Sequence, residues 1–95
     1  MKKKKKLNVI DFKKRHALNR FYDRFGAILS NEDYNIILSK IKNSKADLLQ
    51  RHKNNITLYR MWHMDIEFIC VYNSKLDVIV TFYEPTEEKF NKGLY

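Results

Sequence analysis

The side chains best suited to chemistry in this sequence stand in one short stretch, HALNRFYDRFG at positions 16–26. On a helix, His16, Arg20 and Arg24 follow one another at intervals of four residues and form a single stripe. An imidazole can take or give a proton near neutral pH, and guanidiniums bind phosphate oxygens in pairs. This stripe predicts a surface that binds or cleaves an anionic substrate. It is also typical of an ordinary amphipathic helix with a basic side, on which Asp23 pairs with its arginine neighbours.

Histidine, arginine, threonine and tyrosine can cleave RNA without a metal ion, through attack of the RNA's own 2′-hydroxyl. A base removes the hydroxyl proton, an acid protonates the leaving oxygen, and arginines stabilise the charge that develops around phosphorus. We predict His16 as base or acid and Arg20 and Arg24 as phosphate ligands. Thr81 and Tyr83, near the end of the last expected strand, would orient the phosphate or relay a proton. The alternative for His16 is an exposed helix residue without a chemical role.

Four further residues are expected to contact nucleic acid. Lys13 and Lys14 place positive charge directly before His16, where it favours a bound phosphate. Arg60 and His63 stand at the end of an expected strand and in the turn after it. They join the site if that end of the strand lies near the helix.

Metal ions and nucleotide cofactors are not expected. The histidines are far apart, and metal-binding spacings such as HxxxH or CxxC do not occur. With only two glycines there is no glycine-rich phosphate loop. Cys70 is the only cysteine, so an internal disulfide is impossible and a reducing compartment, the cytoplasm, is expected. Its place among apolar strand residues indicates a small buried hydrophobe rather than a nucleophile.

The net charge of +8 predicts an anionic partner, most often nucleic acid. Lys2–Lys6 contribute five of these charges, so the rest of the chain carries only +3. We expect a basic tail and lead-in over 1–12, a single domain over 13–85 and a C-terminal tail over 86–95. A disordered lysine run would add non-specific phosphate affinity or only aid solubility. No apolar run approaches the roughly 18 residues of a transmembrane helix, so a membrane partner is not expected.

Two helices are expected in the first half of the chain. The first follows a lead-in, LNVIDF at 7–12, that is either extended or already the first helical turn, and it ends at Gly26. The second begins at Ser30, whose hydroxyl can cap it while Asp33 completes a capping box. Its apolar side has helical spacing and consists of Tyr34, Ile37, Leu38 and Ile41.

From position 46 onward the apolar residues alternate, which predicts strands over 47–53, 56–62, 66–72 and 76–83 with short turns between them. Connections this short give an antiparallel meander. The expected fold is therefore α+β, with two N-terminal helices packed on a four-stranded antiparallel sheet. Alternation places Trp62 in the core. It places Ile79 on the same strand side as Thr81 and Tyr83.

The pattern H-A-x-x-R-F-x-x-R-F-G, a capped helix and a meander ending in I-V-T-x-x-x-P resembles a group of small phage and bacterial proteins, mostly uncharacterised. These are similar to the toxin ribonucleases of the RelE, barnase and colicin type. The resemblance, from about Arg15 to Pro85, implies a metal-independent site with an early-helix His or Arg and a late-strand Thr, Ser or Tyr. His16, Arg20 and Thr81 match these positions, with Arg24 and Tyr83 as further matches.

The chain departs from that group in its lysine run and in the turn at 63–65, which lacks the usual glycine. We expect a RelE-like endoribonuclease or a toxin-like RNA-binding protein. The alternative is a non-enzymatic phage-encoded module that binds and inhibits a host protein or a nucleic-acid-processing complex. RNA or another nucleic acid is the expected partner. A host protein target, an antitoxin, or a second copy of the chain in a homodimer are the other partner classes.

Overall fold

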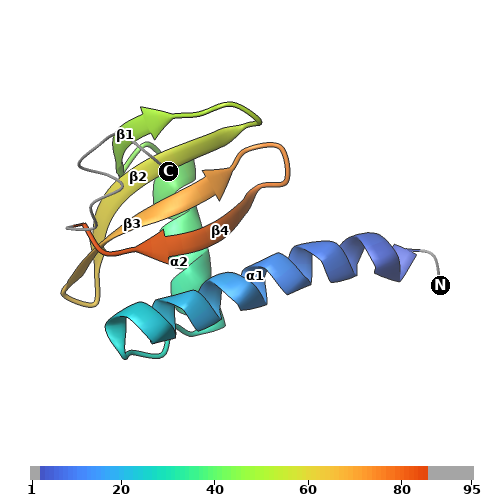
Figure 1. The fold of residues 1–95 in the computed structure, drawn as a ribbon, viewed down its shortest axis with the longest axis horizontal. Coiled ribbons are helices and arrows are strands. Elements are labelled where there is room, and N and C mark those ends of the chain that lie inside the picture. The colour runs from blue at the N-terminus through green and yellow to red at the C-terminus, as the bar shows by residue number, and fades with distance from the viewer. Residues whose placement is uncertain (1–2, 86–95) are drawn as a thin grey trace.

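The computed structural model describes residues 3–85, with side chains from Ile10 onward, and has two helices followed by four strands (Figure 1). The helices are α1 (Lys3–Phe25) and α2 (Asn31–Lys42). The strands are β1 (Asp47–Arg51), β2 (Ile56–His63), β3 (Ile66–Asn73) and β4 (Val78–Tyr83). They form one antiparallel sheet in the order β1-β2-β3-β4. The expected α+β fold is confirmed, whereas the C-terminal tail expected over 86–95 lies outside the described residues.

Helix α1 begins at Lys3, well before the Lys13 boundary expected from the sequence. The segment 7–12 is thus helical rather than extended, and Lys3–Lys6 belong to a helix rather than to a disordered run. Lysine is a good helix former, and neither glycine nor proline interrupts the chain before Gly26. The helix ends where predicted, because Gly26 has a φ of +66° and its N–H donates to the Tyr22 carbonyl over 2.8 Å.

Helix α2 begins with the predicted capping box. The Ser30 hydroxyl accepts the Asp33 backbone N–H over 3.0 Å, and the Asp33 carboxylate accepts the Ser30 backbone N–H over 3.2 Å. Two backbone donors of the first turn are therefore satisfied. The apolar side also lies as predicted, since Tyr34, Ile37 and Ile41 are buried.

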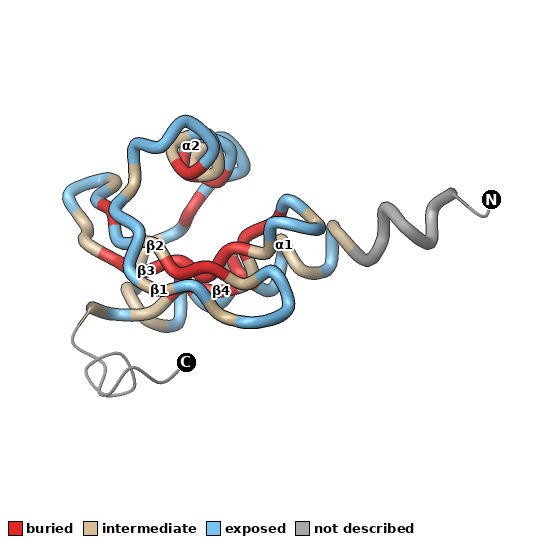
Figure 2. Tube along the Cα trace, turned by 90° about the horizontal axis from the view of Figure 1, so that it is seen from above, coloured by how far each residue is buried: buried red, intermediate tan, exposed pale blue. Residues whose placement is uncertain are grey.

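Both helices contribute to the main core, on what we call the helix face of the sheet. Figure 2 shows α2 to one side of the sheet, and Figure 1 shows α1 lying along β4 in the same direction. Phe21 of α1 is fully buried and meets Phe68 and Phe82 edge to face, with ring centres 5.5 and 5.1 Å apart. Other buried members of this core are Ala17, Leu29, Tyr34, Ile37, Ile41, Met61, Cys70, Tyr72, Val78 and Ile79. The opposite face, the outer face, has a smaller buried cluster of Leu58, Ile69 and Val71.

A bulge in β4 changes which side chains reach each face. Val71 pairs with Thr81 while Tyr72 pairs with Ile79, so Val80 is one residue in excess on β4. Ile79 therefore lies in the helix-side core, and its predicted place beside Thr81 is wrong. Its backbone N–H donates to the buried Tyr34 hydroxyl over 2.9 Å. This bond satisfies a donor that would be costly to leave unpaired.

The two hairpins on either side of β2 turn through residues with positive φ. Asn54 and Asn55 have φ values of 64° and 66°, and Met64 and Asp65 have 55° and 59°. Two successive left-handed residues make the turn that matches the twist of antiparallel strands. Asparagine adopts this conformation readily, whereas the Met64 side chain opposes it.

The double substitution M64N and D65G is expected to raise the free energy of unfolding by about 1 kcal/mol, because Asn-Gly is the preferred pair for this turn. Urea denaturation of both proteins measures the difference. As a control, Lys75→Gly changes a turn residue without a positive φ and should not stabilise the protein. An unchanged or lower stability of the double variant would contradict the assignment of this turn.

Candidate nucleic-acid interface

The arginine stripe of α1 meets the last strand at one defined contact. The guanidinium carbon of Arg24 lies 4.7 Å from the centre of the Tyr83 ring. This is within the range of a cation–π interaction, which holds the flat guanidinium against the ring. Two segments predicted separately to carry the site are thus in contact.

The remaining predicted catalytic residues can be placed from this contact. Because α1 and β4 run in the same direction (Figure 1), Arg20, about 6 Å before Arg24 on the helix, comes level with Thr81. Thr81 precedes Tyr83 by about 7 Å on the strand, and the two pair with Val71 and Ile69 of the outer face. His16 lies one turn further along α1 and is exposed. We call this line of residues, His16, Arg20, Arg24, Thr81 and Tyr83, the α1–β4 seam.

Arg20 and Thr81, both predicted to be catalytic, differ in exposure. Thr81 is only 7% exposed as a residue, so little of it faces solvent. The Arg20 side chain is 46% exposed, with one guanidinium nitrogen 3.9 Å from the Asp23 carboxylate. An exposed pair of this kind contributes about 0–1 kcal/mol, and a phosphate can compete with it.

Lys13 and Lys14, the two lysines before His16, lie on different sides of α1. Lys13 lies about 20° around the helix from Arg20 and shares its stripe. Lys14 turns toward the other helix, where its ammonium nitrogen lies 5.0 Å from the centre of the Tyr34 ring. The structure therefore brings Lys13 toward the seam and places Lys14 between α1 and α2.

Arg60 lies on the outer face, in the same cross-strand row as Tyr83. It pairs with Ile69, which in turn pairs with Tyr83. Its guanidinium lies 3.8 Å from the Asp47 carboxylate and 3.7 Å from that of Glu67. Arg60 thus extends the site across the sheet, but with its charge partly balanced by two carboxylates.

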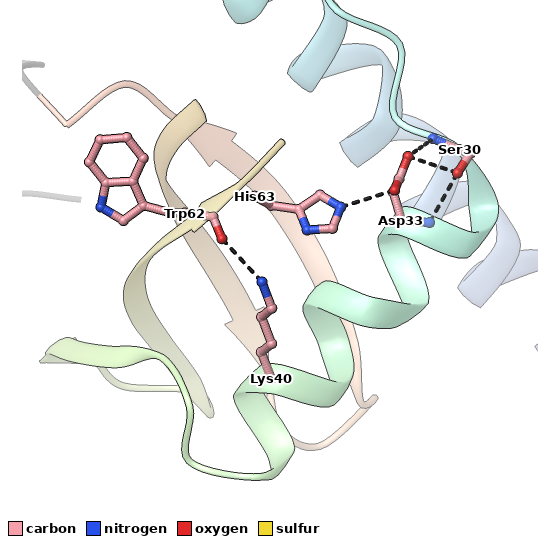
Figure 3. Close-up of polar contacts among 5 residues, drawn as sticks. All are labelled: Ser30, Asp33, Lys40, Trp62 and His63. Atoms are coloured by element: carbon pink, nitrogen blue, oxygen red, sulfur yellow. Dashed lines mark hydrogen bonds and ion pairs between the residues drawn. The ribbon is translucent and has the colours of Figure 1, made fainter. Parts of the chain in front are cut away.

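His63 is directed away from the seam, toward the N-terminus of α2 (Figure 3). Its Nε2 lies 2.9 Å from the Asp33 carboxylate, so Nε2 donates this hydrogen bond, and its side chain is only 12% exposed. The bond from His63, followed by those from Ser30, holds the pKa of Asp33 below its ordinary value. The structure therefore gives His63 a contact that fastens the β2–β3 turn to α2. The sequence showed Asp33 only as a capping residue and gave no sign of this second partner.

The prediction that Trp62 belongs to the core is wrong, because the residue is 61% exposed. It lies on the outer face opposite Glu67, beyond the end of the Leu58, Ile69 and Val71 cluster. Figure 3 shows its indole directed away from α2, on the side opposite the His63 ring. The alternation of the strand correctly predicts the side on which Trp62 lies. It does not show that Trp62 lies beyond the buried cluster on that side.

Cys70 is fully buried, and burial raises the pKa of its thiol, so it is not a nucleophile at neutral pH. Within the described part of the chain, the structure has no group of three or more His, Cys, Asp or Glu side chains arranged to hold a metal ion. No helix in residues 3–85 combines the length and the apolar character needed to cross a membrane. No family model, curated protein or solved structure was found to match the chain.

Proposed function

We propose that the protein is a RelE-like, metal-independent endoribonuclease, or a toxin-like RNA-binding protein derived from one, that acts in the cytoplasm. The observation that supports this most is the Arg24–Tyr83 contact, which joins the His/Arg stripe of α1 to the late-strand residues of β4. The single buried thiol of Cys70 suits a reducing compartment.

The proposed reaction is an internal transfer at phosphorus. The ribose 2′-oxygen forms a bond to phosphorus while the bond to the 5′-oxygen of the next nucleotide breaks, leaving a 2′,3′-cyclic phosphate and a 5′-hydroxyl. His16, exposed on the stripe, takes the 2′-hydroxyl proton or gives a proton to the leaving 5′-oxygen, and Tyr83 or a water molecule makes the other of these two transfers. Arg20 and Arg24 bind the phosphate and stabilise its developing charge. Thr81, which is largely buried, positions the phosphate from the strand side together with Tyr83.

This proposal is tested by incubating single-stranded RNA with the protein in EDTA. We expect cleavage with 2′,3′-cyclic phosphate ends, and a drop of about 10²-fold in kcat/KM for Arg24→Ala because a donor to the charged transition state is lost. Arg24→Lys should recover only part of the rate, since an ammonium lacks the planar fork.

Arg15→Ala is the matched control, because Arg15 is an exposed arginine of the same helix that pairs with Asp11 away from the stripe. It should leave the rate within about two-fold of the starting protein, as expected of a surface change of under about 0.5 kcal/mol. The proposal would be contradicted by RNA that stays intact for hours. An equal loss of kcat/KM in Arg24→Ala and Arg15→Ala would also contradict it.

The second candidate function, a non-enzymatic module that binds a host protein, is favoured by a hollow beside α1 with both apolar and polar lining residues. It is lined by Leu18, Asn19, Tyr22, Asp23, Ile28 and Leu29. Ile28 is 79% exposed and Tyr22 is 55% exposed, as is common for side chains that become buried against a protein partner. This function predicts a stable complex in gel filtration that Ile28→Ser disrupts, with RNA left intact.

A further inference from the structure

We propose that Trp62 is a stacking platform for an unpaired base, so that the substrate of the α1–β4 seam is single-stranded RNA that crosses the outer face of the sheet. This inference rests on the proposed function and names its substrate class. It starts from the 61% exposure of an indole on a strand, in a sheet whose two phenylalanines, Phe68 and Phe82, are fully buried. An aromatic ring exposed to this extent offers a face on which a base can stack.

Two contacts from α2 hold the backbone at Trp62 and at the residue after it. The Lys40 ammonium donates to the Trp62 carbonyl over 3.1 Å, and the next residue, His63, donates to Asp33 over 2.9 Å. Both contacts reach β2 from α2, whereas the indole points away from that helix (Figure 3). A platform whose backbone is fixed loses less conformational freedom when a base binds to it.

The surroundings of the indole suit a nucleotide. Trp62 borders a hollow of about 270 Å³ whose other lining residues are Lys40, Lys45, Asp47, Arg60 and Met61. The three cations outnumber the two nearby carboxylates, Asp47 in the lining and Glu67 opposite Trp62 and 3.7 Å from Arg60, so the net charge here is positive. A base on the indole therefore lies on the same sheet face as the Arg60 guanidinium, and an aromatic ring beside a cation is the combination that binds single-stranded nucleic acids. A duplex is excluded from this mode because its bases are stacked on one another.

Trp62 and the seam lie on one continuous face. In the row next to Trp62, Arg60 pairs with Ile69 and Ile69 with Tyr83, whose ring holds Arg24. Arg60 and Tyr83 stand two strands apart, which is about 10 Å. One RNA strand that passes from the indole over Arg60 to Tyr83 therefore brings a phosphate to Arg24.

The chain itself supplies the probe, because Trp62 is its only tryptophan. We would titrate the full-length protein with a single-stranded 2′-O-methyl oligonucleotide of about ten nucleotides, which fits common site sizes and cannot be cleaved by 2′-hydroxyl attack. We expect saturable quenching of the tryptophan emission, and at least ten-fold weaker binding of the same sequence as a duplex. Binding by the variants is followed by the anisotropy of a labelled oligonucleotide.

Trp62→Ala is expected to weaken oligonucleotide binding by about ten-fold or more, whereas Trp62→Phe keeps most of the affinity because it keeps a ring. In the cleavage assay Trp62→Ala should raise KM and leave kcat nearly unchanged. Tyr22→Ala is the matched control, since Tyr22 is an aromatic residue that is 55% exposed on α1 and lies about 160° around the helix from Arg24, and the affinity of this variant should not change.

An oligonucleotide that binds without changing the emission, or Trp62→Ala with unchanged KM, would overturn the stacking role while leaving the ribonuclease proposal intact. Wild-type protein that neither binds nor cleaves single-stranded RNA overturns both. Emission that changes with protein concentration and not with oligonucleotide would identify Trp62 as a contact between two copies of the chain, and it overturns the proposal as well.

Discussion

His16→Ala is expected to lower the rate of RNA cleavage by about 10²- to 10⁴-fold, the usual contribution of a general acid or base. His16 is the imidazole on the α1 stripe that also carries Arg20 and Arg24, and it is exposed to solvent. Loss of the imidazole removes proton transfer but leaves the two arginines to bind phosphate. The affinity for a 2′-O-methyl oligonucleotide should therefore change little. Cleavage rates in EDTA and oligonucleotide binding, measured side by side, separate these two effects.

The matched control is His52→Ala. His52 follows the end of β1, the edge strand farthest from β4, and hydrogen-bonds to Gln50 of that strand. It should therefore have no part in cleavage. We expect His52→Ala to cleave at the wild-type rate. Equal activity of His16→Ala and the wild type would remove His16 from the mechanism, even if RNA binding remains.

Phe21→Ala is expected to lower the free energy of unfolding by about 3–5 kcal/mol, the range for removal of a buried phenylalanine. Phe21 is fully buried and contacts Phe25, Phe68 and Phe82, with ring centres 4.7, 5.5 and 5.1 Å away. Alanine leaves a cavity where these rings meet and weakens the attachment of α1 to the sheet. Small domains are stable by only about 5–15 kcal/mol. Urea denaturation should therefore show a much less stable protein.

Tyr22→Ala tests whether this effect comes from burial rather than from helix propensity. Tyr22 follows Phe21 directly on α1 but is 55% exposed, so its loss should cost less than about 1 kcal/mol. Phe21→Leu, which retains most of the volume, should lie between the two. Similar losses for Phe21→Ala and Tyr22→Ala would show that α1 does not depend on the aromatic core.

Local signals in the sequence were sufficient for the second helix and for the strand order. Ser30 and Asp33 formed the capping box that their spacing predicted, because both partners lie within one turn. Gly26 ended α1 for an equally local reason. The meander followed from connections too short for any other topology.

Predictions from the sequence were wrong or incomplete where the position of a side chain depends on other segments of the chain. The bulge at Val80 interrupts the alternation of β4, so Ile79 before it and Thr81 after it lie on opposite faces of the sheet. His63 and Asp33 are thirty residues apart, and nothing local links them. Trp62 kept its predicted strand side, but its exposure depends on what covers the outer face. The alternation of apolar residues along one strand does not show which other residues pack over that strand.

The α1–β4 seam also joins two segments of the described chain that lie far apart in the sequence. Each strand pairs with the next one along the chain, so the sheet can form through three local hairpin closures. Arg24 and Tyr83, in contrast, meet only when a loop of nearly the whole domain has closed. Detachment of α1 from β4 would thus separate the proposed catalytic groups while the hairpins persist. Amide hydrogen exchange in α1 should then report on the integrity of the site before it reports on global unfolding.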